Sequence, residues 1–364
     1  MTAVGATQLA AIPPAGSVGV VGVGRARATS MAAVWLLAGA ALLLAGCSAS
    51  GASAASPGTV AYVATVAGLA DPGSTLTMVD TATSTTLGTI TTGSLPAAMA
   101  ATPDGAQLLV ANKGINRLSE ISIATGKATG EATVGLEPDA VAVTPDGSLA
   151  LVANFGDNTV TPVALPSMKA GPPVPVGRQP DAVAISPNGK MAVVANYGDG
   201  TVTPIELPAM TPQPPVPAGS EPDAVVIGPG STTALVADFE TSSVTPIDLS
   251  HLVAGPAIPV AGNPTDIALW KSGTVAYVSG GDSVTPVDLV SLTAGSPLPV
   301  GITAQALALA DNGRTAWVCA GNGTLVSLKL DNGAVGARVA VGGQPTAVVI
   351  PAPPGTGTSP GGGS

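Results

Sequence analysis

Short apolar runs alternate with polar turns along most of the chain. Residues 138–165 read PDAVAVTPDGSLALVANFGDNTVTPVAL, and residues 180–207 read PDAVAISPNGKMAVVANYGDGTVTPIEL. The Pro-Asp-Gly and Pro-Asn-Gly turns supply the unusual backbone angles of tight hairpins, and the apolar runs between them have the length of strands. The pattern therefore predicts consecutive antiparallel strands.

The four strands expected in each unit differ in character. Those expected at 181–186 and 190–195 are apolar at consecutive positions, which indicates burial on both faces. The third contains Pro204, and its counterparts in other units contain Pro162, Pro246 and Pro286. Each of these prolines should cost a ladder hydrogen bond or mark a β-bulge. The fourth strand is rich in proline, which places it at the outer edge.

The unit recurs with a fixed period. Prolines 96, 138, 180, 222 and 264 are 42 residues apart, and the register continues to Ala304 and Pro345. Four strands in about 40–45 residues are typical of a propeller blade. Six units begin at these register positions, three strands precede them at 60–64, 76–80 and 87–92, and one follows at 346–350. We therefore predict an all-β, seven-bladed β-propeller of four-stranded antiparallel blades over residues 59–350, closed by the three N-terminal strands and the C-terminal strand in one blade.

The N-terminus has the pattern of a secretory leader. Arg25 and Arg27 precede an apolar run from Met31 to Ala45, which is shorter than the roughly 20 residues that span a bilayer. The run ends in Leu44-Ala45-Gly46-Cys47, which resembles the lipobox of bacterial lipoproteins, in which the cysteine is lipidated. We expect a signal peptide over 1–46 and a lipid anchor on Cys47; the alternative is ordinary signal cleavage beside a chance cysteine.

Composition and charge narrow the expected surroundings of the protein. The net charge is −10, and loss of the two arginines of the leader would make it about −12, so nucleic acid is not an expected ligand. Residues 47–58 have the composition of a flexible tether and residues 351–364 that of a disordered tail. The second cysteine, Cys319, lies in an expected buried strand and is interpreted as a small apolar residue. A monomer on the outer leaflet of the cytoplasmic membrane is the expected state.

A degenerate tetrapeptide ends the second strand of most units. It reads YVAT at 62–65, LVAN at 109–112 and 151–154, VVAN at 193–196 and LVAD at 235–238, and Thr-Val-Thr follows it in several units. These motifs resemble the YVTN-type β-propeller repeat, a family that includes bacterial surface and secreted proteins. The resemblance covers essentially residues 59–350 and implies the propeller fold. It leaves the activity open, because this fold hosts enzymes, binders and scaffolds.

Two sets of residues are candidates for a binding site. An aspartate follows the register proline in three successive units, and an aromatic residue begins the turn after the second strand in the same units. These residues are Asp139, Asp181 and Asp223, and Phe155, Tyr197 and Phe239. Both sets should lie at the channel mouth on one face of blades 3 to 5, with Asp157 and Asp199 beside them. Rings beside carboxylates suit a sugar, a cationic ligand or a basic partner segment.

Other interpretations of these residues remain open. The aspartates can cap turns, the rings can pack between blades, and recent duplication can explain why three units share them. A calcium site is a further alternative, although no turn has the dense oxygen-ligand pattern of a known loop. The single histidine, His251, falls in a turn between the third and fourth strands, and no Ser-His-Asp arrangement or Cys/His metal cluster can be assembled.

The sequence favours a non-enzymatic function. We expect a lipid-anchored extracytoplasmic propeller that binds a cell-envelope protein or glycan, with no catalytic residue, metal or cofactor. The alternative is an enzyme similar to lactonase or lyase propellers that uses channel carboxylates and a divalent metal ion. A third interpretation is a spacer or surface-coat protein without a small ligand.

Overall fold

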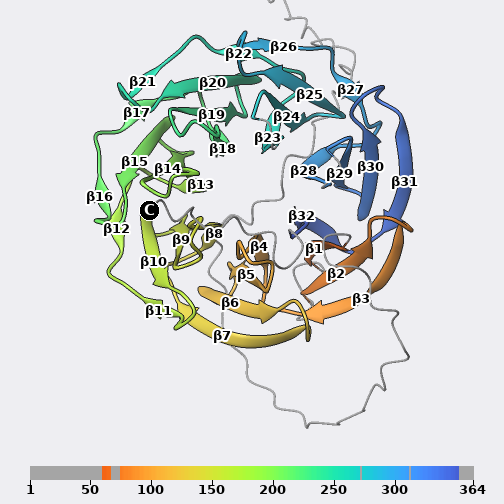
Figure 1. The fold of residues 1–364 in the computed structure, drawn as a ribbon, viewed down its shortest axis with the longest axis horizontal. Coiled ribbons are helices and arrows are strands. Elements are labelled where there is room, and N and C mark those ends of the chain that lie inside the picture. The colour runs from red at the N-terminus through yellow and green to blue at the C-terminus, as the bar shows by residue number, and fades with distance from the viewer. Residues whose placement is uncertain (1–59, 67–73, 271–272, 311–312, 352–364) are drawn as a thin grey trace, which may run out of the picture. The chain divides into compact units, whose positions relative to one another are not determined.

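The computed structural model describes residues 60–66, 74–270, 273–310 and 313–351. These residues form 32 strands in seven antiparallel sheets and no helix. The sheets are the blades of a propeller and follow one another around a central axis (Figure 1). The expected fold class and number of blades are therefore confirmed. The leader, Cys47, the tether and all but the first residue of the expected tail lie outside the described residues.

Blade 1 closes the ring by combining both ends of the described chain. Its sheet has the order β3-β2-β1-β32, so the last strand pairs with the first. Tyr62 lies opposite Val349 and Ala64 opposite Ala347 in this pairing. The four strands are β1 (Val60–Val66), β2 (Thr75–Asp80), β3 (Thr85–Thr91) and β32 (Gln344–Val349). Closure therefore occurs as the three-plus-one count predicted.

Blades 2 and 7 have a continuous outer strand. Each of these two blades has four strands, which follow one another along the chain from the innermost strand to the outermost. Blade 2 consists of β4 (Pro96–Ala101), β5 (Gln107–Asn112), β6 (Arg117–Ser122) and β7 (Lys127–Thr133), and blade 7 of β28 (Ala304–Leu309), β29 (Thr315–Ala320), β30 (Thr324–Lys329) and β31 (Val335–Ala340).

Blades 3 to 6 have an outer strand that is divided into two short pieces, both of which pair with the third strand. Blade 3 contains β8 (Pro138–Val143), β9 (Leu149–Asn154), β10 (Thr159–Ala164), β11 (Lys169–Ala170) and β12 (Val174–Pro175). Blade 4 contains β13 (Pro180–Ile185), β14 (Met191–Asn196), β15 (Thr201–Glu206), β16 (Thr211–Pro212) and β17 (Val216–Pro217). Blade 5 contains β18 (Pro222–Ile227), β19 (Thr233–Asp238), β20 (Ser243–Asp248), β21 (Val253–Ala254) and β22 (Ile258–Pro259). Blade 6 contains β23 (Pro264–Leu269), β24 (Val275–Gly280), β25 (Ser283–Asp288), β26 (Thr293–Ala294) and β27 (Leu298–Pro299).

The third-strand prolines explain the division of the outer strand. Pro162 keeps its place opposite Leu151 in the ladder with β9, without a register shift. Its carbonyl accepts a hydrogen bond from Gly171 N at 2.7 Å, so this residue's hydrogen-bonding edge faces the outer strand. Because proline has no N–H, the outer ladder is interrupted at this point and resumes at β12. The sequence predicted that each such proline would either lose a ladder hydrogen bond or form a β-bulge. At Pro162 the ladder hydrogen bond to the outer strand is lost, and no bulge forms in the pairing with β9.

The core consists of seven apolar clusters, one at each boundary between neighbouring blades. Leu151 and Ala153 of blade 3, for example, pack with Val194 and Ile205 of blade 4, and all four side chains are fully buried. Consecutive residues of each second strand point to opposite faces of the sheet and so enter different clusters. This explains the uninterrupted apolar runs in the sequence. Cys319 is buried in one of these clusters, as expected.

A β-bulge occurs near the start of the innermost strand in all seven blades. In blade 3, Pro138 pairs with Asn154 and Ala140 with Ala153, so Asp139 has no opposite residue. The bulged residues around the ring are Thr346, Ala97, Asp139, Asp181, Asp223, Thr265 and Gln305. A bulge re-aims the side chain of the extra residue, and here it does so at the same place in every blade. The aspartates singled out in the sequence are thus bulge residues.

Candidate functional site: the rim of blades 2 to 5

One face of the propeller carries both sets of candidate residues. Pro180 lies opposite Asn196, so the innermost strand of blade 4 begins where the second strand ends. The same register holds in blades 3 and 5. We call this face, at the turns between second and third strands, the rim. His251 belongs to the turn between β20 and β21, which lies at the opposite end of blade 5, and its Nδ1 contacts Asp248 Oδ2 at 2.8 Å.

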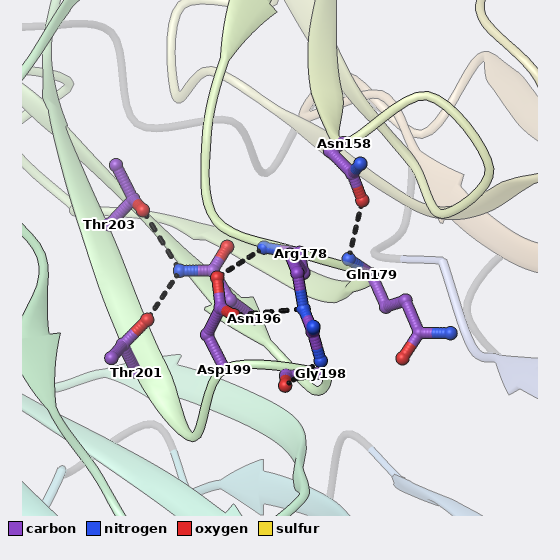
Figure 2. A network of polar contacts seen from close by, with 8 residues as sticks. All are labelled: Asn158, Arg178, Gln179, Asn196, Gly198, Asp199, Thr201 and Thr203. Carbon is purple, nitrogen blue, oxygen red and sulfur yellow. Dashed lines mark hydrogen bonds and ion pairs between the residues drawn. The ribbon is translucent and has the colours of Figure 1, made fainter.

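A buried polar residue anchors each rim turn of blades 2 to 5. It is the last residue of the second strand, it is fully buried, and it is Asn112, Asn154, Asn196 or Asp238. In blade 4, Asn196 Nδ2 donates to Thr201 Oγ1 at 3.0 Å and to Thr203 Oγ1 at 2.9 Å, as Figure 2 shows. These bonds hold the start of the turn against the third strand. The aromatic residue that follows is thereby fixed at the rim.

Glycine is required opposite each of these anchors. A Cβ on Gly177 would lie 2.5 Å from Asn196 Cγ, and one on Gly219 would lie 2.2 Å from Asp238 Cγ. Equivalent approaches of 2.6 Å occur at Gly93 and Gly135. Separations this short exclude any side chain without movement of the buried amide or carboxyl. The loop entering each innermost strand is therefore packed directly on the anchor of its own blade.

Blade 5 differs from its neighbours because its anchor is a carboxyl group. Asp238 accepts hydrogen bonds from Thr245 Oγ1 at 2.6 Å and from Gly219 N at 2.9 Å. Burial disfavours the charged form and raises the pKa of Asp238 to about 6, and the hydrogen bonds only partly oppose this. The carboxyl therefore changes its charge in a mildly acidic medium.

The first predicted aspartate is held by a lysine from the preceding blade. Lys113 Nζ lies 2.7 Å from Asp139 Oδ2 and 3.8 Å from Glu137 Oε2. The same ammonium lies 4.7 Å from the centroid of the Phe155 ring, which is cation–π distance. The structure thus brings Asp139 and Phe155 together, as expected, and adds a cation that the sequence analysis did not single out. Lys113 stands 42 residues before Phe155, so the repeat alignment contains the signal that would have found it.

The other two predicted aspartates are less accessible. Asp181 and Asp223 are each only 5% exposed, so their carboxyl groups contribute little to the open surface. Asp157 and Asp199 are exposed but serve their own turns: Asp157 Oδ2 accepts from Leu136 N, and Asp199 Oδ2 from Arg178 N, both at 2.6 Å. Glu221 and Glu240 are further carboxylates of this face, which the sequence analysis missed because they are not repeated in every blade.

A hollow of about 430 Å³ opens on the rim between blades 4 and 5. Blade 4 contributes the half-buried Tyr197 and the ion pair between Arg178 Nε and Asp199 Oδ1, which are 3.0 Å apart (Figure 2). Blade 5 contributes Glu221 and Glu240. Ser220 Oγ donates to Glu240 Oε2 at 2.5 Å. The three carboxylates outnumber the one guanidinium, so the hollow has a net negative charge next to an aromatic ring.

The described part of the chain contains no evident metal site. No group of three or more His, Cys, Asp or Glu side chains there could hold a metal ion. The three bulge aspartates come from three successive blades and form no such group. Within the same residues, no helix is long and apolar enough to cross a membrane.

Comparison with solved structures supports the propeller fold. The chain is similar to a functionally unknown protein from Desulfotomaculum acetoxidans DSM 771, with a TM-score of 0.71 and 18% identity over 81% of this chain and 99% of that one. It is similar to a putative 6-phosphogluconolactonase from Bacteroides uniformis ATCC 8492, with a TM-score of 0.66 and 18% identity over 80% and 98% of the two chains. A third similar structure is hydrazine synthase from Kuenenia stuttgartiensis, with a TM-score of 0.64 and 21% identity over 70% of this chain and 88% of that one.

These similarities define the class of the protein as a seven-bladed β-propeller. Their identities are too low to carry an activity from any of the three proteins to this chain. No protein-family model matches the sequence, and no curated protein matches it.

Proposed function

We propose that this protein is a partner-binding propeller, tethered through a lipid on Cys47 to the outer leaflet of the cytoplasmic membrane, and that it engages a cell-envelope partner through the rim of blades 3 to 5. The observation that carries the proposal is the hollow between blades 4 and 5, where Tyr197 adjoins the carboxylates of Glu221 and Glu240. A concave surface on which a few polar groups converge beside an aromatic side chain is a candidate recognition site.

The charge of the rim favours a basic protein segment over a glycan as the partner. Glu221 and Glu240 form no ion pair with any lysine or arginine of the described chain. The whole chain carries a net charge of −10, so a basic partner is attracted at long range as well. The enzymatic alternative, a metal-dependent lactonase or lyase, has no observation in the described residues that favours it.

The lipid anchor rests on the Leu44-Ala45-Gly46-Cys47 sequence alone. Replacement of that cysteine, Cys47→Ser, should abolish incorporation of a labelled fatty acid in the native host and release the protein from the membrane fraction. Retention of label in this variant would overturn the anchor and leave the rim proposal intact.

The binding function is tested by affinity capture from a cell-envelope extract. The chain from Ser48 onward retains every strand of the ring and can serve as soluble bait. We expect a specific partner that is lost from the Tyr197→Ala, Glu221→Gln, Glu240→Gln triple variant. The matched control, Glu131→Gln with Glu206→Gln, removes two exposed charges from blades 2 and 4 away from the hollow and should capture normally. Equal capture by the bait and the triple variant would exclude the rim as the binding surface.

A further inference from the structure

At the boundary between blades 2 and 3, the protein already binds an ammonium group of its own. Lys113 extends from the rim turn of blade 2 to Asp139 and Glu137 of blade 3, at 2.7 Å and 3.8 Å, with its Nζ 4.7 Å from the centroid of the Phe155 ring. Only 26% of the lysine side chain and 16% of the Asp139 side chain are exposed. Two carboxylates and one ring face thus form a receptor for a primary ammonium group.

The same receptor positions recur two blades further on, at the boundary between blades 4 and 5. Adding 84 to each residue number leads from Glu137 to Glu221, from Asp139 to Asp223 and from Phe155 to Phe239, which conserve the chemistry at all three positions. The lysine position leads to a tyrosine, Tyr197. The sequence therefore repeats the two carboxylate positions and the ring position at this boundary but has a tyrosine in place of the lysine.

The hollow opens at the same boundary, beside these positions: Asp223 is buried at 5% exposure, and neither it nor Phe239 lines the hollow. The hollow is lined by Tyr197 and Glu221, the counterparts of Lys113 and Glu137. It is also lined by Glu240, whose counterpart in blade 3 is Gly156. Compared with the boundary between blades 2 and 3, this boundary therefore has one additional carboxylate, and it has Tyr197 in place of the lysine. The only cationic side chain in the lining, Arg178, is engaged by Asp199 and by the carbonyl of Gly198 at 2.7 Å.

The boundary between blades 3 and 4 shows that the pattern is not a general property of the repeat. There the glutamate position is Gln179, the lysine position is Phe155, and the position of Glu240 is Gly198. That boundary has neither the cation nor the additional carboxylates. The charge complementarity to an ammonium group is thus confined to one boundary that is filled by Lys113 and to one that presents an open hollow.

We propose that the hollow between blades 4 and 5 binds the side chain of a lysine from the partner protein, at the blade boundary equivalent in the repeat to the one that Lys113 fills between blades 2 and 3. The inference rests on the proposed partner-binding function and specifies its chemistry. Glu221 and Glu240 receive the ammonium group, and Tyr197 contacts the aliphatic stem of the incoming side chain.

The first test uses a capped Gly-Gly-Lys-Gly-Gly peptide and an otherwise identical peptide with norleucine in place of lysine. Binding to the chain from Ser48 onward is followed by NMR or calorimetry at low ionic strength. We expect the lysine peptide to bind and the norleucine peptide not to bind. The Glu221→Gln, Glu240→Gln double variant should weaken binding by about tenfold or more, because both ammonium partners are lost. The Glu131→Gln, Glu206→Gln control should bind normally.

A second variant makes the protein occupy its own hollow. In Tyr197→Lys, a lysine stands at the position equivalent to Lys113, and we expect it to pair with Glu221, to raise the melting temperature at low salt and to abolish binding of the lysine peptide. Equal binding of the two peptides, or normal binding by the double variant, would overturn the inference. If the envelope partner is still lost from the triple variant in that case, the proposed function stands and only its lysine chemistry fails.

Discussion

Lys113 Nζ of blade 2 and Asp139 Oδ2 of blade 3 are joined by an ion pair of 2.7 Å across the boundary between the two blades. The pair is largely shielded from solvent and is covered on one side by the ring of Phe155. It therefore ties the rim turn of one blade to the innermost strand of the next.

Removal of the Lys113 ammonium group should destabilise the boundary between blades 2 and 3. We expect Lys113→Met to lower the free energy of unfolding by about 1–2 kcal/mol. A partly buried ion pair beside an aromatic ring contributes more to stability than an exposed ion pair does. A double-mutant cycle with Asp139→Asn in urea measures the coupling. The same cycle on the exposed pair of Arg117 and Glu131, at 2.9 Å, should give about 0.5 kcal/mol or less. Equal couplings would show that shielding by Phe155 contributes nothing.

The buried carboxyl of Asp238 should make stability depend on pH. Its pKa is about 6 in the folded protein and 3.8 for an unperturbed carboxyl, so the folded state binds more protons between these values. Stability should therefore fall as the pH rises from about 4 to 6 and stay level above it, with a total change on the order of 2–3 kcal/mol. Asp238→Asn should remove this fall and make the protein more stable than the wild type at pH 7.5.

Urea unfolding at pH 4.5, 5.5 and 7.5 measures this difference between the wild type and Asp238→Asn. The reciprocal change in blade 4, Asn196→Asp, should introduce the same kind of pH dependence, because Asn196 is equally buried beside two threonines. Parallel stability profiles for the wild type and Asp238→Asn would show that the Asp238 carboxyl titrates normally.

A methyl group on Gly177 should disrupt the rim of blade 4. Its Cβ would lie 2.5 Å from Cγ of the buried Asn196, so Gly177→Ala should cost about 1–3 kcal/mol through overpacking. Gly230→Ala is the matched control, because its nearest neighbour is a threonine hydroxyl at 3.4 Å in an exposed turn. Thermal unfolding of both variants distinguishes them, and equal melting temperatures would contradict the packing described for the anchor.

Removal of β32 should open the ring. A chain that ends after residue 340 lacks the strand that pairs with β1, and leaves Val63 and Ala64 without their ladder partners Val348 and Ala347. It also removes the hydrogen bond from Thr346 Oγ1 to the carbonyl of Pro96 at 2.7 Å. We expect loss of cooperative thermal unfolding and increased proteolysis, whereas a chain that ends after residue 351 should unfold like the full chain. Cooperative unfolding of the shorter chain would mean that closure is dispensable.

The 42-residue period and the alternation of apolar runs and turns were sufficient to predict the architecture. Blades 2 to 7 are each formed by contacts within about 40 consecutive residues, and closure requires only that three strands at one end and one at the other complete a sheet. The positions of Asp139 and Phe155 on one face also follow from this register. The repeat therefore determines the fold and the face on which the candidate residues lie.

Only the tertiary structure decided which of these residues are accessible. Asp181 and Asp223 look equivalent to Asp139 in the sequence, yet they are 5% exposed, and Lys113 rather than a ligand holds Asp139. Glu221 and Glu240 are candidates because they line the hollow, which forms only in the folded protein. The physical reason is that the rim is formed between blades. Its contacts join residues of neighbouring blades, such as Lys113 with Asp139 and Phe155. Their burial depends on how two sheets pack, which a pattern within one repeat does not contain.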